Sequence, residues 1–200
     1  MAVNLIKGQK IDLTKNAPGL KHIMVGLGWD EAKQGFKLSK LFGKGGDDFD
    51  CDASAILINE KTGKAAGKND LVYFGNLTHK SEAVKHMGDN LTGEGDGDDE
   101  QIFVDLTILP GQYSKIVFVV NIYEPTARNQ DFGMIENAFI RLGDNDTGNA
   151  LCIYNLSENY KGRTAMIFGE LYRHGSEWKF SAIGEGTNDD GVGQLLKRYC

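Results

Sequence analysis

Short hydrophobic runs recur along this chain, and Gly, Asn and Asp separate them. Many of the runs alternate apolar and polar residues, which is the period of a half-buried β-strand. Eleven segments fit this pattern: residues 3–6, 11–13, 22–27, 53–59, 71–74, 102–106, 115–122, 137–142, 151–156, 165–171 and 178–183. The run KIVFVVNIY is β-branched and aromatic, so it predicts a central buried strand. We therefore expect an all-β fold, an antiparallel β-sandwich with a few short helical segments.

Helical signals are few. Residues 81–86 could form a turn or two of helix, and residues 193–199 could form a C-terminal helix. The 200 residues fit one domain, 1–200, that is long enough to bury a core. Residues 31–48 break the strand pattern with lysines and glycines, so we expect a mobile surface insertion there. Its amphipathic stretch FKLSKLF is alternatively a contact for a partner or a membrane. We expect the tail at about 192–200 to be individual to this chain.

The charge of the chain is concentrated in one place. Asp and Glu number 28 against 22 Lys and Arg, a net charge of −6. The stretch from Asp89 to Glu100 holds six acidic residues and no basic one, so the remainder is formally neutral. A nucleic-acid-binding protein needs a basic face against phosphates, and this distribution argues against that class.

The sequence favours a cytoplasmic protein. The N-terminal MAVNLIKGQKIDL lacks the apolar run of a signal peptide, and no stretch approaches the ~20 apolar residues of a membrane span. Cys51, Cys152 and Cys200 are odd in number and lack ligand-like spacing, as in a reducing compartment. We expect Cys51 and Cys152 to be small apolar core residues.

The acidic stretch HMGDNLTGEGDGDDEQ, residues 86–101, suits calcium. Calcium takes six to eight oxygen ligands from carboxylates, amides, backbone carbonyls and water, and glycines let the backbone bend around it. An ordered strand, IFVDL, follows directly. A solvated acidic loop is the simpler interpretation. Mg²⁺ or Mn²⁺ is the alternative ion, because hard oxygen ligands disfavour zinc and copper.

This stretch is not an EF-hand. Asp89 and Glu100 stand at the first and twelfth positions that such a loop requires. Leu91 and Gly93 occupy the third and fifth positions, and Glu94 replaces the invariant glycine. A site of another kind is therefore expected, completed by residues distant in the sequence.

Further acidic candidates lie at predicted strand ends. Asp30 ends the motif VGLGWD, and Asp70 precedes LVYF. In FDCDASAIL the apolar residues alternate, so Asp50 and Asp52 share the opposite face of the strand. Each of the four could equally be an ordinary strand-end or solvent-facing aspartate.

One short pattern, D-N-x-T-G, occurs at residues 89–93 and again at 144–148. Asn, Asp and Gly suit the dihedral angles of a hairpin turn, and such a turn explains the second copy. A second metal site there is the alternative.

The sequence carries no recognisable catalytic motif. It lacks the GxSxG, GxxxxGK[ST] and HExxH patterns, and no His stands at zinc-ligand spacing with a Cys. His86, three residues before Asp89, is either a ligand-orienting or a structural histidine. Tyr172, Trp178 and Phe180 alternate in a predicted strand, where core packing is favoured over stacking on a sugar.

Several of these segments together resemble the TerD family of tellurium-resistance and stress proteins. They are VGLGWD, FDCDASA, HMGDNLTGEGDGDDE, FGMIENAFIRL and MIFGELYRHGSEWKFSAIGEG, in order over residues 2–191. The resemblance implies a β-sandwich that binds calcium, usually two ions, in a cytoplasmic bacterial stress protein working beside membrane-associated relatives. The implied metal ligands are Asp30, Asp50, Asp52, Asp89, Asn90, Asp96, Asp98, Asp99 and Glu100, with Asp70 as a further candidate. The chain departs from the family in Cys51, between the paired aspartates, and in a longer insertion at 31–48.

We therefore expect a calcium-binding stress-response and tellurite-resistance protein that is not an enzyme. It would act through other stress or tellurium-resistance proteins, including ones associated with the inner face of the membrane, and would bind no nucleic acid. The first alternative is a carbohydrate- or small-molecule-binding module stabilised by calcium. The second is a metal-dependent hydrolase, which needs an open coordination position for an activated water.

Overall fold

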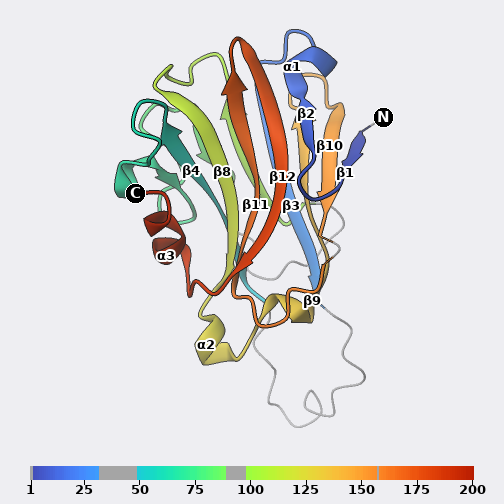
Figure 1. Cartoon of the computed structure of the whole chain (residues 1–200), viewed down its shortest axis with the longest axis vertical. Helices are drawn as coiled ribbons and strands as arrows, with labels where there is room; N and C mark the ends of the chain where they lie inside the picture. Colours follow the sequence, from blue (N-terminus) through green and yellow to red (C-terminus); the bar gives the residue numbers. More distant parts are fainter. Residues whose placement is uncertain (1, 32–48, 89–97, 157) are drawn as a thin grey trace.

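The computed structural model describes residues 2–31, 49–88, 98–156 and 158–200. Within them the chain forms two β-sheets packed face to face (Figure 1). The first sheet, sheet A, has the order β1 (Val3–Leu5), β10 (Ala150–Asn155), β9 (Ile135–Asp144), β3 (His22–Glu31), β7 (Glu100–Asp105) and β6 (Val84–His86). The second, sheet B, has the order β2 (Lys10–Asp12), β12 (Glu177–Thr187), β11 (Ala165–His174), β8 (Tyr113–Ile122), β4 (Cys51–Asn59) and β5 (Leu71–Val72).

The predicted sandwich is confirmed. All strand pairs are antiparallel except β1 with β10, which is parallel. The main core lies between the sheets, where alternate residues such as Ile23, Val25 and Leu27 of β3 meet Phe118 and others of β8.

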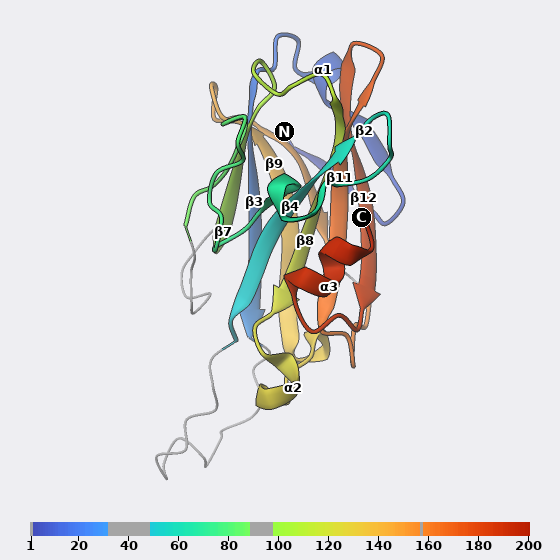
Figure 2. The ribbon, with the colours of Figure 1, turned by 90° about the vertical axis from the view of Figure 1, so that its left-hand side faces the viewer.

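A second apolar cluster explains the continuous apolar run in β8. Helix α3 (Val192–Lys197) packs on the outer face of sheet B (Figure 2) and brings Leu195 and Leu196 against Ile56, Val117 and Val119. Strands β4 and β8 are consequently buried on both faces, which is why their sequences read as continuous apolar runs. The C-terminal helix predicted at residues 193–199 is thus confirmed.

Short helical turns complete the described chain: α1 (Leu13–Asn16), α2 (Pro125–Arg128), η2 (Gly67–Asp70) and η3 (Phe132–Met134). The helix suggested for residues 81–86 is wrong, because Val84–His86 is strand β6, paired with β7. Leu13, expected at a strand end, begins α1. The segments 32–48 and 89–97 lie outside the described residues.

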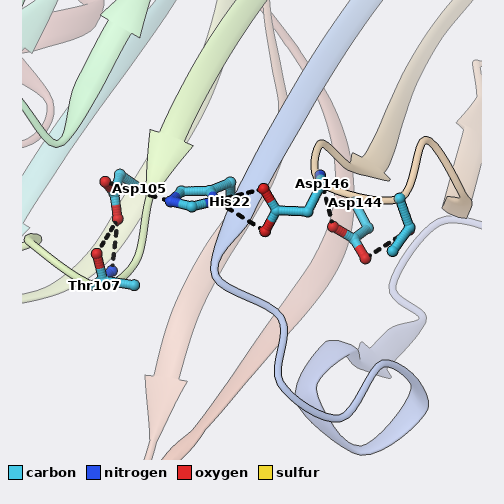
Figure 3. Close-up of polar contacts among 6 residues, drawn as sticks. His22, Asp105, Thr107, Asp144 and Asp146 are labelled. Atoms are coloured by element: carbon cyan, nitrogen blue, oxygen red, sulfur yellow. Dashed lines mark hydrogen bonds and ion pairs between the residues drawn. The ribbon is translucent and has the colours of Figure 1, made fainter.

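The hairpin turn predicted at 144–148 is confirmed between β9 and β10 (Figure 3). The carboxylate of Asp144 accepts hydrogen bonds from the Asp146 amide at 3.0 Å and from the Thr147 hydroxyl at 2.7 Å. His22 Nδ1 lies 2.7 Å from Asp146 Oδ1, and its Nε2 lies 3.6 Å from Asp105 Oδ2. These contacts tie the turn to β3 and β7.

Candidate functional site

The candidate ligands that the structure describes, apart from Asp70, lie at one end of the sandwich. Asp30 is near the end of β3, and Asp50 and Asp52 stand at the start of β4. Asp98 and Asp99 lead into β7, which begins at Glu100. Leu27 pairs with Glu100, and the Asp99 amide donates to the Leu27 carbonyl at 2.8 Å, so β7 begins beside the last part of β3, which continues from Leu27 to Glu31. Asp89, Asn90 and Asp96 lie outside the described residues.

A β-bulge positions Asp30. Gly28 pairs with Phe139 and Asp30 pairs with Glu136, so two residues of β9, Asn137 and Ala138, lie opposite one residue of β3. Asn137 has a left-handed φ of 54°, which Asn tolerates better than most residues. Its Nδ2 donates to Asp30 Oδ2 at 2.8 Å, and this contact orients the exposed Asp30 carboxylate.

Asp99 lies close enough to Asp30 for their charges to interact. Its Oδ2 accepts a hydrogen bond from the Trp29 amide at 2.8 Å. Burial raises the pKa of Asp99, and the negative charges of Asp30 and Asp98 raise it further, while the Trp29 hydrogen bond acts in the opposite direction. A bound cation would remove this cost of holding like charges together.

Glu100 joins the two sheets. Strand β5 covers β4 only at Ala55 and Ile56, so the backbone of Ala53 lacks a strand neighbour on that side. The Ala53 amide donates instead to Glu100 Oε2, and the Ala53 carbonyl lies 3.2 Å from His86 Nε2. The Gly88 amide donates to His86 Nδ1 at 3.2 Å, so the proton of the neutral imidazole resides on Nε2. His86 is therefore a structural histidine of the sheet junction.

Asp52 has a partner that sequence reasoning missed. Asn121 of β8 pairs with Asp52 in register, and its Nδ2 donates to Asp52 Oδ2 at 3.0 Å. Asn121 is only 4% exposed, and its Oδ1 has no hydrogen-bond partner within the described part of the chain. A buried amide oxygen in that situation loses its hydration without compensation, which makes it a candidate ligand for a hard cation.

The pKa of the Cys51 thiol reflects its burial and the negative charges around it. Cys51, Ala53, Ala55 and Leu57 belong to the main core, as the alternation predicted. Burial raises the pKa of the Cys51 thiol well above its usual value, and the carboxylates of Asp52, Glu100, Asp50 and Asp99 raise it further. Asp50 Oδ2 lies 4.0 Å from Arg128 Nη1, a positive charge at this end of the sandwich.

Asp98 is paired with Arg141. Its carboxylate lies over Gly26 on the outer face of β3, where any Cβ would overlap it. Arg141 Nε and Nη2 donate to its two oxygens, and Gln101 Nε2 donates to Oδ2 at 3.0 Å. Because a guanidinium already neutralises Asp98, we expect it to contribute less to cation binding than Asp99.

Asp70 belongs to a different network. It lies beside β5, whose residues pair with Ala55 and Ile56, roughly 10–13 Å along β4 from Asp52 at about 3.3 Å per residue. Tyr113 donates its hydroxyl to Asp70 Oδ1 at 2.7 Å, and the Ala66 amide donates to Oδ2 at 2.8 Å. His79 Nε2 and Lys80 Nζ each lie 3.5 Å from Oδ1. The structure does not bring Asp70 together with the other candidate ligands.

We predict that this Asp70 network makes folding acid-sensitive. Burial lowers the pKa of His79 below the 6.5 of an unperturbed histidine, although Asp70 opposes the shift. The unfolded chain therefore takes up a proton that the folded chain refuses, and stability is lost as the pH falls below about 6.5. Urea unfolding in chelator at pH 7 and pH 5 should show a smaller loss for His79→Gln than for the wild type. Equal losses in the two proteins would contradict the assignment.

The described residues contain no preformed cluster of three or more His, Cys, Asp or Glu side chains with metal-ligand geometry. The carboxylates come from both sheets instead. Asp30 and Asp99 interact with each other, the charges of Asp50, Asp52 and Asp99 all act on the Cys51 thiol, and Glu100 reaches from β7 to Ala53 of β4. Asn121, Asn137 and Arg141 were missed because single polar residues in strands carry no spacing signal, and only strand register shows their partners.

Burial tests the prediction of core packing for three aromatic residues. It is confirmed for Trp178 and Phe180, which are core residues, so neither offers a sugar an open face. Tyr172 is only half-buried and lies outside the core cluster. Within the described residues, no helix is long and apolar enough to cross a membrane.

Comparison with known proteins gives a consistent answer. The model of the TerD domain matches residues 1–199. The stress response protein SCP2 of Bacillus subtilis is 54% identical over 200 residues, covering 100% of both chains. The tellurium resistance protein TerD of Serratia marcescens is 46% identical over 186 residues, 93% of this chain and 91% of that one. A solved homologue of the telluride resistance protein from Streptomyces coelicolor A3(2) shares the fold, with a TM-score of 0.63 at 20% identity over 87% of this chain and 94% of that one. The chain therefore belongs to the TerD family of stress-response and tellurium-resistance proteins.

Proposed function

We propose that this member of the family binds calcium at the end of the sandwich where Asp30, Asp52 and Glu100 lie. We also propose that it acts in the cytoplasm through partner proteins and without catalysis. The observation that carries the proposal is the buried Asn121 oxygen without a hydrogen-bond partner, next to Asp52 in a region crowded with carboxylates. A divalent cation supplies the positive charge and the oxygen coordination that such a group lacks.

The donor set fits a hard cation. Carboxylates and a side-chain amide oxygen are the ligands that calcium prefers, and the thiol of Cys51 is buried in the core. Asp50, Asp52 and Asn121 would hold one ion in sheet B, and Asp30 and Asp99 would hold another in sheet A, which agrees with two ions. Bound calcium would neutralise the repulsion between strands and fix the strand ends that a partner contacts.

The names of the relatives support a role in stress response and tellurium resistance, since they include a stress response protein and tellurium resistance proteins. The alternative of a sugar-binding module is less supported, because Trp178 and Phe180, two of its three candidate stacking residues, are buried.

Calorimetric titration of calcium into the purified chain tests the proposal. We expect saturable binding to the wild type, and at least tenfold weaker binding to Asp52→Asn, since one ligand charge is lost (about 1.4 kcal/mol). Glu60→Gln is the matched control, because Glu60 is exposed and follows the opposite end of the same strand, β4. Equal affinities for the wild type and Asp52→Asn would place the ion elsewhere.

A further inference from the structure

Two buried oxygen atoms of sheet B lack a hydrogen-bond partner within the part of the chain that the structure describes. One is the Asn121 Oδ1 already discussed, and the other is Oγ of Ser54, a residue that is 0% exposed. Most buried polar side-chain atoms in folded proteins have a partner, and a buried atom without one lowers stability. Two such atoms in one place indicate that the site is built to bind something.

The strand register makes Ser54 and Asn121 neighbours. Asp52 pairs with Asn121 and Ser54 pairs with Val119, so Ser54 lies diagonally across from Asn121. Ala53 belongs to the main core, so the alternation along β4 places Asp52 and Ser54 on the opposite, outer face of sheet B. Val119 belongs to the second apolar cluster on that outer face, and Asn121, two residues along β8, shares its face.

The two groups could satisfy each other but do not. A serine hydroxyl can donate to an amide oxygen, yet the structure forms no hydrogen bond between Ser54 and Asn121. The Asn121 amide instead turns its nitrogen to Asp52 Oδ2 at 3.0 Å, which leaves Oδ1 free. A hydroxyl oxygen and an amide oxygen both carry lone pairs, and a hard cation binds both.

We propose that the Ser54 hydroxyl is a further ligand of the ion in sheet B, bound directly or through one water. This inference rests on the proposed function, because it adds one residue to the site of Asp50, Asp52 and Asn121. Calcium takes six to eight oxygen ligands, so a neutral hydroxyl beside the carboxylates and the amide brings the site closer to that number. The hydroxyl lowers the stability of the ion-free protein and is compensated when the ion binds.

Ser54→Ala should therefore act in opposite directions on the two states of the protein. Calorimetric titration should show calcium binding about tenfold weaker than in the wild type, the lower end of the range for residues that support a metal site. In chelator, the melting temperature of the variant should equal or exceed that of the wild type, because a buried hydroxyl without a partner is removed. A purely structural serine would instead lower the melting temperature equally in chelator and in calcium.

Ser181→Ala is the matched control. Ser181 is another buried serine of sheet B, but it lies in β12, which β11 and β8 separate from β4. Its substitution should leave the calcium affinity unchanged. The amide spectrum of each variant in chelator verifies its fold.

Two results would overturn the role of Ser54. One is an unchanged calcium affinity in Ser54→Ala, as expected if the hydroxyl binds only a water. The other is a lower melting temperature of this variant in chelator, which would show that the hydroxyl has a partner within the protein. If the wild type itself bound no calcium, the proposed function would fail as well, so the two failures are distinguishable.

Discussion

Calcium at about 100 times its dissociation constant is expected to raise the free energy of unfolding by about 2.7 kcal/mol, because it binds the folded chain and not the unfolded one. For a domain of this size, 1 kcal/mol shifts the melting temperature by about 2–4 °C, so the expected rise is roughly 5–11 °C. The physical source is the relief of repulsion among carboxylates that the fold holds together: burial raises the pKa of Asp99, and the negative charges of Asp30 and Asp98 raise it further. Differential scanning calorimetry in calcium and in chelator measures the rise.

Asp52→Asn separates this effect from general charge screening. It should lose the part of the calcium-dependent rise that comes from the ion in sheet B, whereas Glu60→Gln should keep the whole rise. Both variants remove one charge from residues at or next to opposite ends of β4. A melting temperature that does not change on adding calcium would count against the site. So would a rise of equal size in Asp52→Asn.

The second large effect concerns Glu100. Glu100→Ala is expected to lower the free energy of unfolding by about 2–4 kcal/mol, because it leaves the buried Ala53 amide without an acceptor and opens a cavity between the sheets. Loss of a negative charge near Asp99 acts in the opposite direction but is the smaller contribution, since it removes only one of several interacting carboxylates. Urea unfolding in chelator measures the change without the contribution of calcium.

Glu100→Gln is the matched variant for this prediction. The glutamine carbonyl keeps an acceptor for the Ala53 amide and nearly the same volume, so most of the stability should remain. Equal destabilisation by Ala and Gln would show that the charge, and not the bridge between the sheets, accounts for the role of Glu100.

Much of the fold could be predicted because apolar and polar residues alternate along many of its strands. The alternation in FDCDASAIL correctly places Cys51, Ala53, Ala55 and Leu57 in the core. The segment 81–86 was mispredicted because Glu82, Ala83 and Lys85 suit a helix locally, whereas pairing with β7 imposes a strand on Val84–His86. Such pairing is a tertiary effect that local sequence does not carry.

The site could be predicted only in part. The pattern of acidic residues at strand ends predicted Asp30, Asp50 and Asp52 as candidate ligands, and the sandwich brings their strand ends together. Asp70 also precedes a predicted strand in the sequence. In the fold, however, it lies farther along β4 than these residues do, in a network with Tyr113 and His79. The bridge from Glu100 to Ala53 depends on β5 being too short to cover β4, which no sequence pattern reveals.

The most direct test of the central claim is the calcium titration followed by calorimetry, repeated on Asp52→Asn. The account predicts saturable, calcium-dependent heat with a stoichiometry near two for the wild type and a clear loss of affinity in the variant. An absence of binding heat, or binding that Asp52→Asn leaves unchanged, would contradict the claim that oxygens of separate strands converge on calcium at this end of the sandwich.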